Sequence, residues 1–229
     1  MIRYSIYILA IIFSQSLFSQ KKNDCETLKI LADSLFLSNP DSSYIVSIEF
    51  EKCAIQSNDQ LLIARSNIAT GRYLLLKSDL EEANIKFNKA SKIYYDLNDW
   101  NGLGAVLKLK SNLQNRIGNE NESTKLLNEA LVMFRKGNNI KGITTSLLNL
   151  SLRYFKTKEF DKAELTLKDV ENNFSSLSKT DRYYFYQNKG ILLLKTNRLE
   201  EAIKELNKAY ELAKAEKMVD SEATILIYI

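Results

Sequence analysis

Apolar residues recur at helical spacing through most of the chain. Between Leu61 and Leu76 the apolar positions include Ile63, Ile68, Leu74 and Leu75. Polar residues follow at 77–79, and a second run to about Leu97 has one stripe made by Ala83, Phe87, Ala90 and Tyr94. This spacing predicts two amphipathic helices that are separated by a short polar turn.

The same pair of helices returns along the chain. The residues LEEANIKFNKA at 80–90 reappear as LEEAIKELNKA at 199–209. A small residue occupies one equivalent position in each unit, at a nearly constant interval from Ala83 through Ser123 and Ala163 to Ala202. Asparagine-containing turns at 58–59, 98–99 and 138–139 follow the same interval. Self-similarity of this kind predicts a stack of supersecondary units.

A second recurring position lies in the middle of the first helix of each unit. Gly71 and Gly190 occupy it in the outer units, and Ser111 and Ser151 occupy it in the inner ones. Glycine costs about 1 kcal/mol relative to alanine within a helix. Its use at this position predicts a close approach between two helices, with the small residues such as Ala83 on the partner helix.

At these residues the chain resembles the tetratricopeptide repeat family. The match is Gly71-x-x-Leu74 with Ala83-x-x-x-Phe87-x-x-Ala90, echoed by Gly190-x-x-Leu193 with Ala202-x-x-x-Leu206-x-x-Ala209. The interval is about 40 residues instead of the family's 34, as in long-repeat variants of bacterial regulatory proteins, and the family's terminal proline is absent. HEAT repeats share the longer interval, but the alanine spacing favours the tetratricopeptide pattern.

The resemblance implies an all-α fold, a right-handed α-solenoid of stacked antiparallel helix hairpins. We expect a degenerate N-terminal hairpin at residues 20–60, four full hairpins at 61–220, and the start of a further repeat at 221–229. The apolar residues at 225–229 would then lack a partner helix. We therefore expect that end either to dock a partner or to continue in a longer protein.

The resemblance also implies a groove, lined by the first helix of each pair, that binds a peptide or protein. Its first half would be basic and rich in amides, with Arg65, Ile68, Arg72, Leu75, Lys108, Asn112, Asn115 and Arg116. Its second half would be apolar and aromatic, with Leu148, Asn149, Leu152, Phe155, Tyr184, Gln187, Ile191 and Leu194. A groove that is basic first and apolar second suits a partner peptide with an acidic segment followed by a hydrophobic anchor.

Part of this groove resembles the carboxylate clamp of the family. Lys108 and Asn112 lie one helical turn apart, and Asn149 follows in the next unit. The basic pair of the third unit is missing, because Tyr184 and Asn188 stand there. A solvated polar helix face is the alternative interpretation.

The N-terminal residues have the pattern of a secretory signal peptide. Arg3 precedes an apolar run at residues 6–13, and small or polar residues follow. We expect removal of residues 1–19, although Leu17 departs from the small-residue rule at the cleavage site. An uncleaved anchor is the alternative, but the apolar run is shorter than a membrane span, which needs about 20 residues. The mature chain is expected to be periplasmic or secreted.

The two cysteines, Cys25 and Cys53, lie at equal distances along the chain on either side of Asn39, which precedes the one proline. If two antiparallel helices meet at that turn, equal distances bring the cysteines together, and export supplies an oxidising compartment. This predicts a disulfide. Two free cysteines that pack as small apolar groups are the alternative.

The amino-acid composition excludes several classes of function. The chain has 229 residues, a formal net charge of +4 and no histidine. The weak charge does not favour nucleic acid, and the aromatic run at 183–186 is a poor base-stacking platform because its rings point around a helix. Without histidine, the common catalytic triads and histidine-bound zinc are excluded. We expect no enzyme activity, no cofactor and no metal.

Two functional hypotheses remain. The first is an exported scaffold that binds a protein or peptide partner in its groove. The second is the sensory ectodomain of a membrane-anchored bacterial signal transducer or transcriptional regulator, truncated before its membrane span and effector domain. In that second case the membrane would be contacted only through a missing C-terminal segment.

Overall fold

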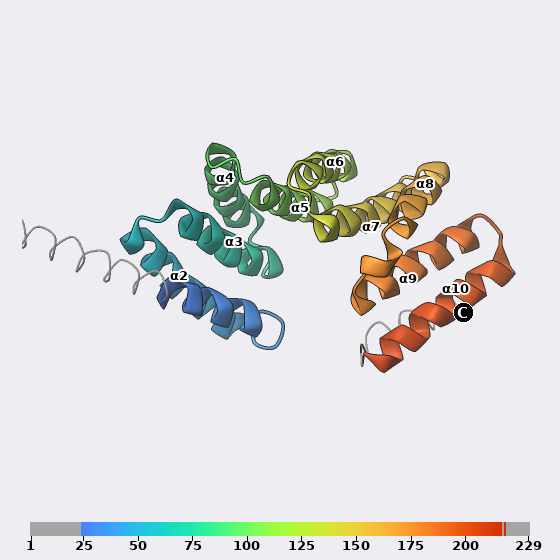
Figure 1. Ribbon diagram of the computed structural model, residues 1–229, viewed down its shortest axis with the longest axis horizontal. Coiled ribbons are helices and arrows are strands. Elements are labelled where there is room, and N and C mark those ends of the chain that lie inside the picture. The colour runs from blue at the N-terminus through green and yellow to red at the C-terminus, as the bar shows by residue number, and fades with distance from the viewer. Residues whose placement is uncertain (1–23, 217, 219–229) are drawn as a thin grey trace, which may run out of the picture. The chain divides into compact units, whose positions relative to one another are not determined.

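The computed structural model describes residues 24–216 and 218, and within them it contains helices and no strands (Figure 1). A helix over residues 24–35 is followed by α2 (Pro40–Ser57), α3 (Gln60–Leu76), α4 (Leu80–Asp96), α5 (Trp100–Arg116), α6 (Glu120–Lys136), α7 (Ile140–Lys156), α8 (Phe160–Glu171), a 3-10 turn η1 (Phe174–Ser176), α9 (Lys179–Lys195) and α10 (Leu199–Ala215). The all-α hairpin prediction is confirmed. The expected signal peptide and the expected repeat start at 221–229 lie outside the described residues.

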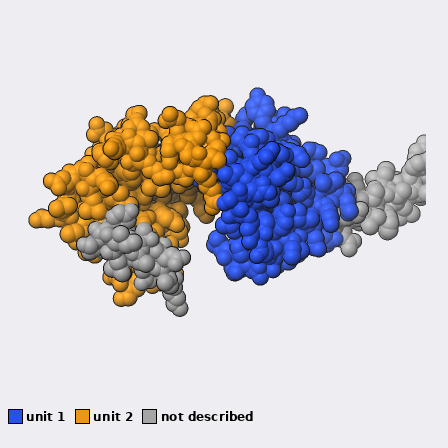
Figure 2. All heavy atoms as spheres, turned by 180° about the vertical axis from the view of Figure 1, so that it is seen from behind, with its two compact units in different colours: residues 1–113 blue, residues 114–229 orange. Residues whose placement is uncertain are grey.

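The chain divides into two compact units, residues 1–113 and residues 114–229 (Figure 2). In the first unit α2 packs on α3 and α3 packs on α4. In the second unit α6 packs on α7, α7 packs on α8, and α9 packs on α10. Within each unit, neighbouring helices in the sequence are thus neighbours in space, which is the sequential stacking that the repeats predict.

The repeat interval comes from a short turn that recurs twice in every repeat. A residue with left-handed backbone conformation stands at the same place in the turns from α2 to α8 and in the turn from α9 to α10, namely Asn58, Ser78, Asn98, Gly118, Asn138, Lys158 and Asn197. The residue after it often caps the next helix: the side chain of Asp59 accepts from the N–H of Leu61, and that of Asn139 from the N–H of Gly142. These turn and capping residues separate helices of 17 residues each in α3 to α7.

The recurring small residues are buried between the helices. Ala83, Ser123, Ala163 and Ala202 are fully buried, and so are Ser111 and Ser151. A Cβ atom on Gly71 would lie 2.6 Å from the ring of Phe87, and one on Gly190 would lie 2.6 Å from the Leu206 side chain. The predicted close approach is therefore present. A large side chain of the second helix lies nearest to each glycine, and at Gly190 the Ala202 carbonyl oxygen would also lie 3.4 Å from the added Cβ.

The regular pattern breaks after α8. Tyr94 and Phe134 lie one repeat apart and pack over Gly102 and Gly142. At the third such pair Arg182 replaces the glycine, and α8 ends after 12 residues instead of 17. An arginine leaves no room for a ring against its backbone. The last turn of α8 is accordingly replaced by η1, which places Phe174 with its ring 5.2 Å from the Arg182 guanidinium.

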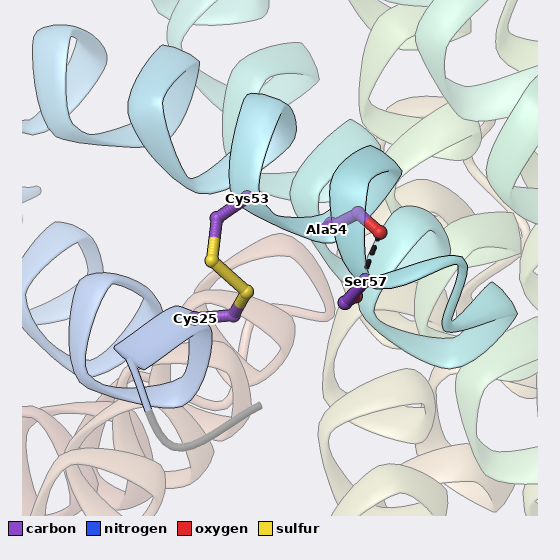
Figure 3. The surroundings of a disulfide bond; sticks show 4 residues. All are labelled: Cys25, Cys53, Ala54 and Ser57. Atoms are coloured by element: carbon purple, nitrogen blue, oxygen red, sulfur yellow. Dashed lines mark hydrogen bonds between the residues drawn. A yellow bond between two sulfur atoms is a disulfide. The ribbon is translucent and has the colours of Figure 1, made fainter. Parts of the chain in front are cut away.

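A disulfide between Cys25 and Cys53 joins the helix over residues 24–35 to α2 (Figure 3). The two Cα atoms are 5.6 Å apart, and Cys25 is fully buried beside Phe50 and Ala54. The turn is fixed by Asn39, whose side chain accepts from the N–H of Ser42. The equal spacing from this turn thus predicted the pairing, and α2 begins at the proline that follows Asn39.

No helix in the described ranges combines the length and the hydropathy that a membrane span needs. Within the same residues, no three acidic or cysteine side chains converge as metal ligands.

Candidate functional site

The first helices of two successive hairpins in the second unit, α7 and α9, enclose a cavity of about 530 Å³. We call it the α7–α9 cavity. It is lined by Thr145, Leu148, Asn149 and Leu152 of α7 and by Asp181, Tyr184, Gln187, Asn188 and Ile191 of α9. The lining residues are spaced by three or four positions on each helix, so they share one helix face. Six of them, namely Leu148, Asn149, Leu152, Tyr184, Gln187 and Ile191, are groove positions expected from the sequence.

The lining of the α7–α9 cavity combines aliphatic side chains with amides and hydroxyls. Leu148 is buried, whereas Tyr184 is 45% exposed. Asp181 is the one charged residue among those that line the cavity. Its carboxylate accepts from the Ser178 hydroxyl at 2.6 Å while its N–H donates to the Ser178 oxygen at 3.1 Å. This reciprocal cap fixes the first turn of α9.

Asn188 joins α7 to α9 at the buried side of the cavity. Its Nδ2 donates to the Leu148 carbonyl and to the Ser151 hydroxyl oxygen, both at 3.0 Å. The Ser151 hydroxyl in turn donates to the same carbonyl at 2.8 Å. Asn188 therefore holds the two helices in register, a role that its place in the clamp pattern did not suggest.

Two expected groove residues of the second unit lie elsewhere. Phe155 packs against the core cluster that contains Leu150 and Leu167. Leu194 packs against the cluster of Tyr183 and Leu206. Both side chains contribute to hairpin packing and do not line the α7–α9 cavity.

In the first unit, two expected groove arginines are paired with acidic residues of the chain itself. Arg65 binds Glu26 at 2.6 Å, and Arg72 binds Asp33 at 3.0 Å. The Arg72 guanidinium also lies 4.0 Å from the centre of the Phe36 ring. These pairs could have been predicted from the sequence, because each acid precedes its arginine by almost one full repeat.

No family model matches the chain, and no curated protein sequence matches it. Among solved structures, BtubC from P. vanneervenii superposes with a TM-score of 0.63 at 12% identity, over 87% of this chain and 92% of that one. A putative kinesin light chain with nearly identical TPR-like repeats, from Podosopora anserina, gives a TM-score of 0.62 at 13% identity, over 83% of this chain and 95% of that one. A STAND signal transduction ATPase with a tetratricopeptide repeat sensor, from Pyrococcus horikoshii, gives a TM-score of 0.60 at 16% identity, over 86% of this chain and 34% of that one.

The described residues have a tetratricopeptide-like fold. The structural neighbours confirm the fold that the alanine spacing indicated. At sequence identities of 12–16% these neighbours show the fold and do not indicate a ligand.

Two further expected residues of the tetratricopeptide-like groove lie on α3, where Ile68 is half-buried and Leu75 is buried. The other four lie on α5. Asn115 is already engaged, because its Oδ1 accepts from Arg153 and, at 3.0 Å, from Lys156. Arg116 is exposed, while Lys108 and Asn112 are half-buried. Lys108 and Asn112 belong to the first unit and Asn149 to the second, so the clamp stays a prediction.

An ion-pair cluster of the second unit surrounds Glu120. Arg153, which is 6% exposed, and Lys156 contact its carboxylate at 3.2 and 2.9 Å. Partial burial raises the pKa of Glu120, but the hydrogen bonds from Lys156 and Arg153 outweigh it and hold the pKa below its ordinary value. The cluster ties α6 to α7 and is structural.

Proposed function

We propose that this protein is a non-enzymatic scaffold that binds a peptide or protein partner in the α7–α9 cavity. The observation that supports this most is the convergence of six groove residues from two helices on one cavity of about 530 Å³. Cavities between helices that combine apolar and convergent polar groups are typical binding sites. The tetratricopeptide-like fold suits the same role, since stacked hairpins offer extended surfaces to protein partners.

The chemistry of the cavity favours an uncharged segment with an apolar anchor. Leu148, Leu152 and Ile191 offer contacts to an aliphatic or aromatic side chain. Asn149 and Gln187 can each donate to and accept from a peptide backbone. This proposal departs from the acidic partner expected from the sequence, because Arg65 and Arg72 already bind carboxylates of the chain.

Export to an oxidising compartment is part of the proposal. The disulfide between Cys25 and Cys53 supports it, because disulfides persist mainly outside the cytosol. The signal peptide pattern at residues 1–19 supports it independently.

The second candidate function is the sensory ectodomain of a signal transducer. The observation that favours it is the likeness to part of a STAND signal transduction ATPase that has a tetratricopeptide repeat sensor. The α7–α9 cavity would then receive the signalling ligand. Reading the gene downstream of Ile229 tests this candidate: an apolar span followed by a new domain supports it, and a stop codon contradicts it.

Site-specific photo-crosslinking tests the scaffold function. A photoreactive phenylalanine at Tyr184, beside the cavity, is expected to capture a discrete partner from an extracellular or envelope fraction. The same group at Tyr95 is the matched control, because Tyr95 is 65% exposed on α4 and far from the cavity in the sequence. Equal capture at both positions would contradict a partner site at α7 and α9.

A second comparison tests the cavity itself. Asn149→Lys places a long charged side chain in the lining and is expected to abolish capture at Tyr184. Asn128→Lys, at an exposed asparagine of α6, makes the same change outside the cavity and is expected to leave capture intact. If both variants capture the partner equally, the binding site lies on another surface.

A further inference from the structure

A second cavity, of about 470 Å³, lies between η1, α9 and α10. We call it the η1 pocket. It shares no lining residue with the α7–α9 cavity. The residues used below are three apolar ones, Phe174, Tyr186 and Leu212, and three basic ones, Arg182, Lys204 and Lys208.

The η1 pocket lies where the repeat is interrupted. In α4 and α6 the second helix of the hairpin runs for 17 residues, whereas α8 stops at Glu171. The residues that would have continued α8 form η1 instead. Phe174 of η1 then packs edge-on against Phe185 and Tyr186 of α9. The irregular turn thus supplies one apolar side of the pocket.

Positive charge surrounds these rings. The Arg182 guanidinium lies 5.2 Å from the Phe174 ring centre, and the Lys208 ammonium lies 5.0 Å from that of Tyr186. Lys208 is also paired with Glu205 at 3.0 Å. Among the lining residues, Glu211 is the one acid against the three cations. Cations that lie over rings still direct N–H groups outward, where they can donate to an anion.

Arg182 has an unused donor. Its Nε is buried without a hydrogen-bond partner, and its Nη2 makes only a long contact of 3.5 Å to the Ser175 carbonyl. Because the Nε atom is itself buried, the guanidinium meets an occupant through its terminal nitrogens. These nitrogens favour an occupant that brings carboxylate or carbonyl oxygens.

We propose that the η1 pocket binds an acidic peptide segment that carries an apolar side chain. Carboxylates of the segment pair with Lys204 and Arg182. The apolar side chain lies against Phe174, Tyr186 and Leu212. The acidic partner with a hydrophobic anchor that the sequence suggested thus fits this pocket, which lies outside the expected groove.

The ring geometry disfavours nucleic acid as the occupant. Stacked bases need free aromatic faces, and here the cations lie over the Phe174 and Tyr186 rings. The formal net charge of +4 over 229 residues is also small for a nucleic-acid-binding chain.

Peptide binding to the full chain tests this proposal. The probe is a fluorescein-labelled peptide Glu-Glu-Phe-Glu-Glu, and its affinity is measured by fluorescence anisotropy at low and at physiological salt. The Lys204→Glu variant is expected to weaken binding by about tenfold. Lys214→Glu makes the same charge change at an exposed lysine of α10 outside the pocket, and it is expected to bind like the wild type.

Two peptide variants separate the apolar contact from charge alone. Glu-Glu-Ala-Glu-Glu and Gln-Gln-Phe-Gln-Gln are both expected to bind more weakly than the original probe. Equal affinity for the alanine peptide, or equal weakening by Lys204→Glu and Lys214→Glu, would overturn the proposal. Displacement of the peptide by a thymidine oligonucleotide of the same net charge would also overturn the proposal.

The outcome is independent of the proposed scaffold function. Asn149→Lys is expected to leave binding of the acidic probe unchanged, and Lys204→Glu is expected to leave capture at Tyr184 unchanged. Circular dichroism of each variant checks that the helices are intact, so a failure at one cavity can be assigned to that cavity.

Discussion

The ring of Phe134 lies directly on the backbone of Gly142, so that a methyl group on this glycine would overlap the ring. Phe134 comes from the second helix of one hairpin and Gly142 from the first helix of the next. The same relationship joins Tyr94 to Gly102 one repeat earlier. The pair thus fixes where one hairpin sits on the next.

Gly142→Ala is expected to lower the free energy of unfolding by up to about 2 kcal/mol. Alanine normally gains about 1 kcal/mol in a helix, but overpacking against the Phe134 ring costs about 1–3 kcal/mol. Urea unfolding followed by circular dichroism measures the difference. In the double variant with Phe134→Leu, Gly142→Ala is expected to become neutral or stabilising, and a loss that persists there would refute the packing explanation.

Loss of the disulfide is expected to destabilise the N-terminal hairpin. The bond between Cys25 and Cys53 closes a loop with a sequence separation of 28 residues, for which the chain-entropy model gives about 3–4 kcal/mol. Thermal unfolding with and without a reductant measures this. The reductant should lower the Tm of the wild type and leave the Cys25→Ser/Cys53→Ser variant unchanged; an equal response of both would contradict the prediction.

Stability is expected to fall at acidic pH in a way that depends on Glu120. Its pKa in the folded protein is depressed, so its contribution to stability is present above its ordinary pKa of 4.5 and is lost as the pH falls through the lower, folded value. Urea midpoints at about pH 7 and about pH 3 measure the loss. Glu120→Gln should reduce the difference between the two midpoints, whereas Glu129→Gln, at an exposed residue of α6, should not.

Asn188→Asp is expected to be more destabilising than Asn188→Ala. The Asn188 amide donates to the Leu148 carbonyl, and an aspartate would place an acceptor against that acceptor in a buried site. Alanine only removes the two donated bonds, at about 1–3 kcal/mol for both together, because the Leu148 carbonyl keeps the bond from the Ser151 hydroxyl. Chemical denaturation ranks the two variants, and the reverse order would show that the amide donors are not what joins α7 to α9.

The repeat interval and the hairpin order were accessible from the sequence because their causes are local. The left-handed residue at Asn98 or Asn138 and the capping residue after it act within one turn of chain. The disulfide was accessible for a similar reason, since equal distances from the turn at Asn39 require only that two helices run antiparallel.

The candidate site was accessible only in part. Leu148, Asn149 and Tyr184 were expected in one groove because the resemblance to the tetratricopeptide pattern places them there, and they line one cavity. Arg65 and Arg72 were expected to be available to a ligand, and the structure pairs them with Glu26 and Asp33. Spacing along a helix assigns a residue to a face, but its partners depend on which side chain the neighbouring hairpin brings there.

The sequence by itself determined that this protein is a series of paired helices of nearly constant length, because turn, cap and apolar spacing are encoded within each helix and the turn that follows it. Tertiary structure decided which polar groups remain available to a partner. It also decided that α8 ends at Glu171 and that residues of η1, α9 and α10 together line the η1 pocket. Both outcomes depend on contacts between residues of different helices, and the apolar spacing along one helix does not predict such contacts.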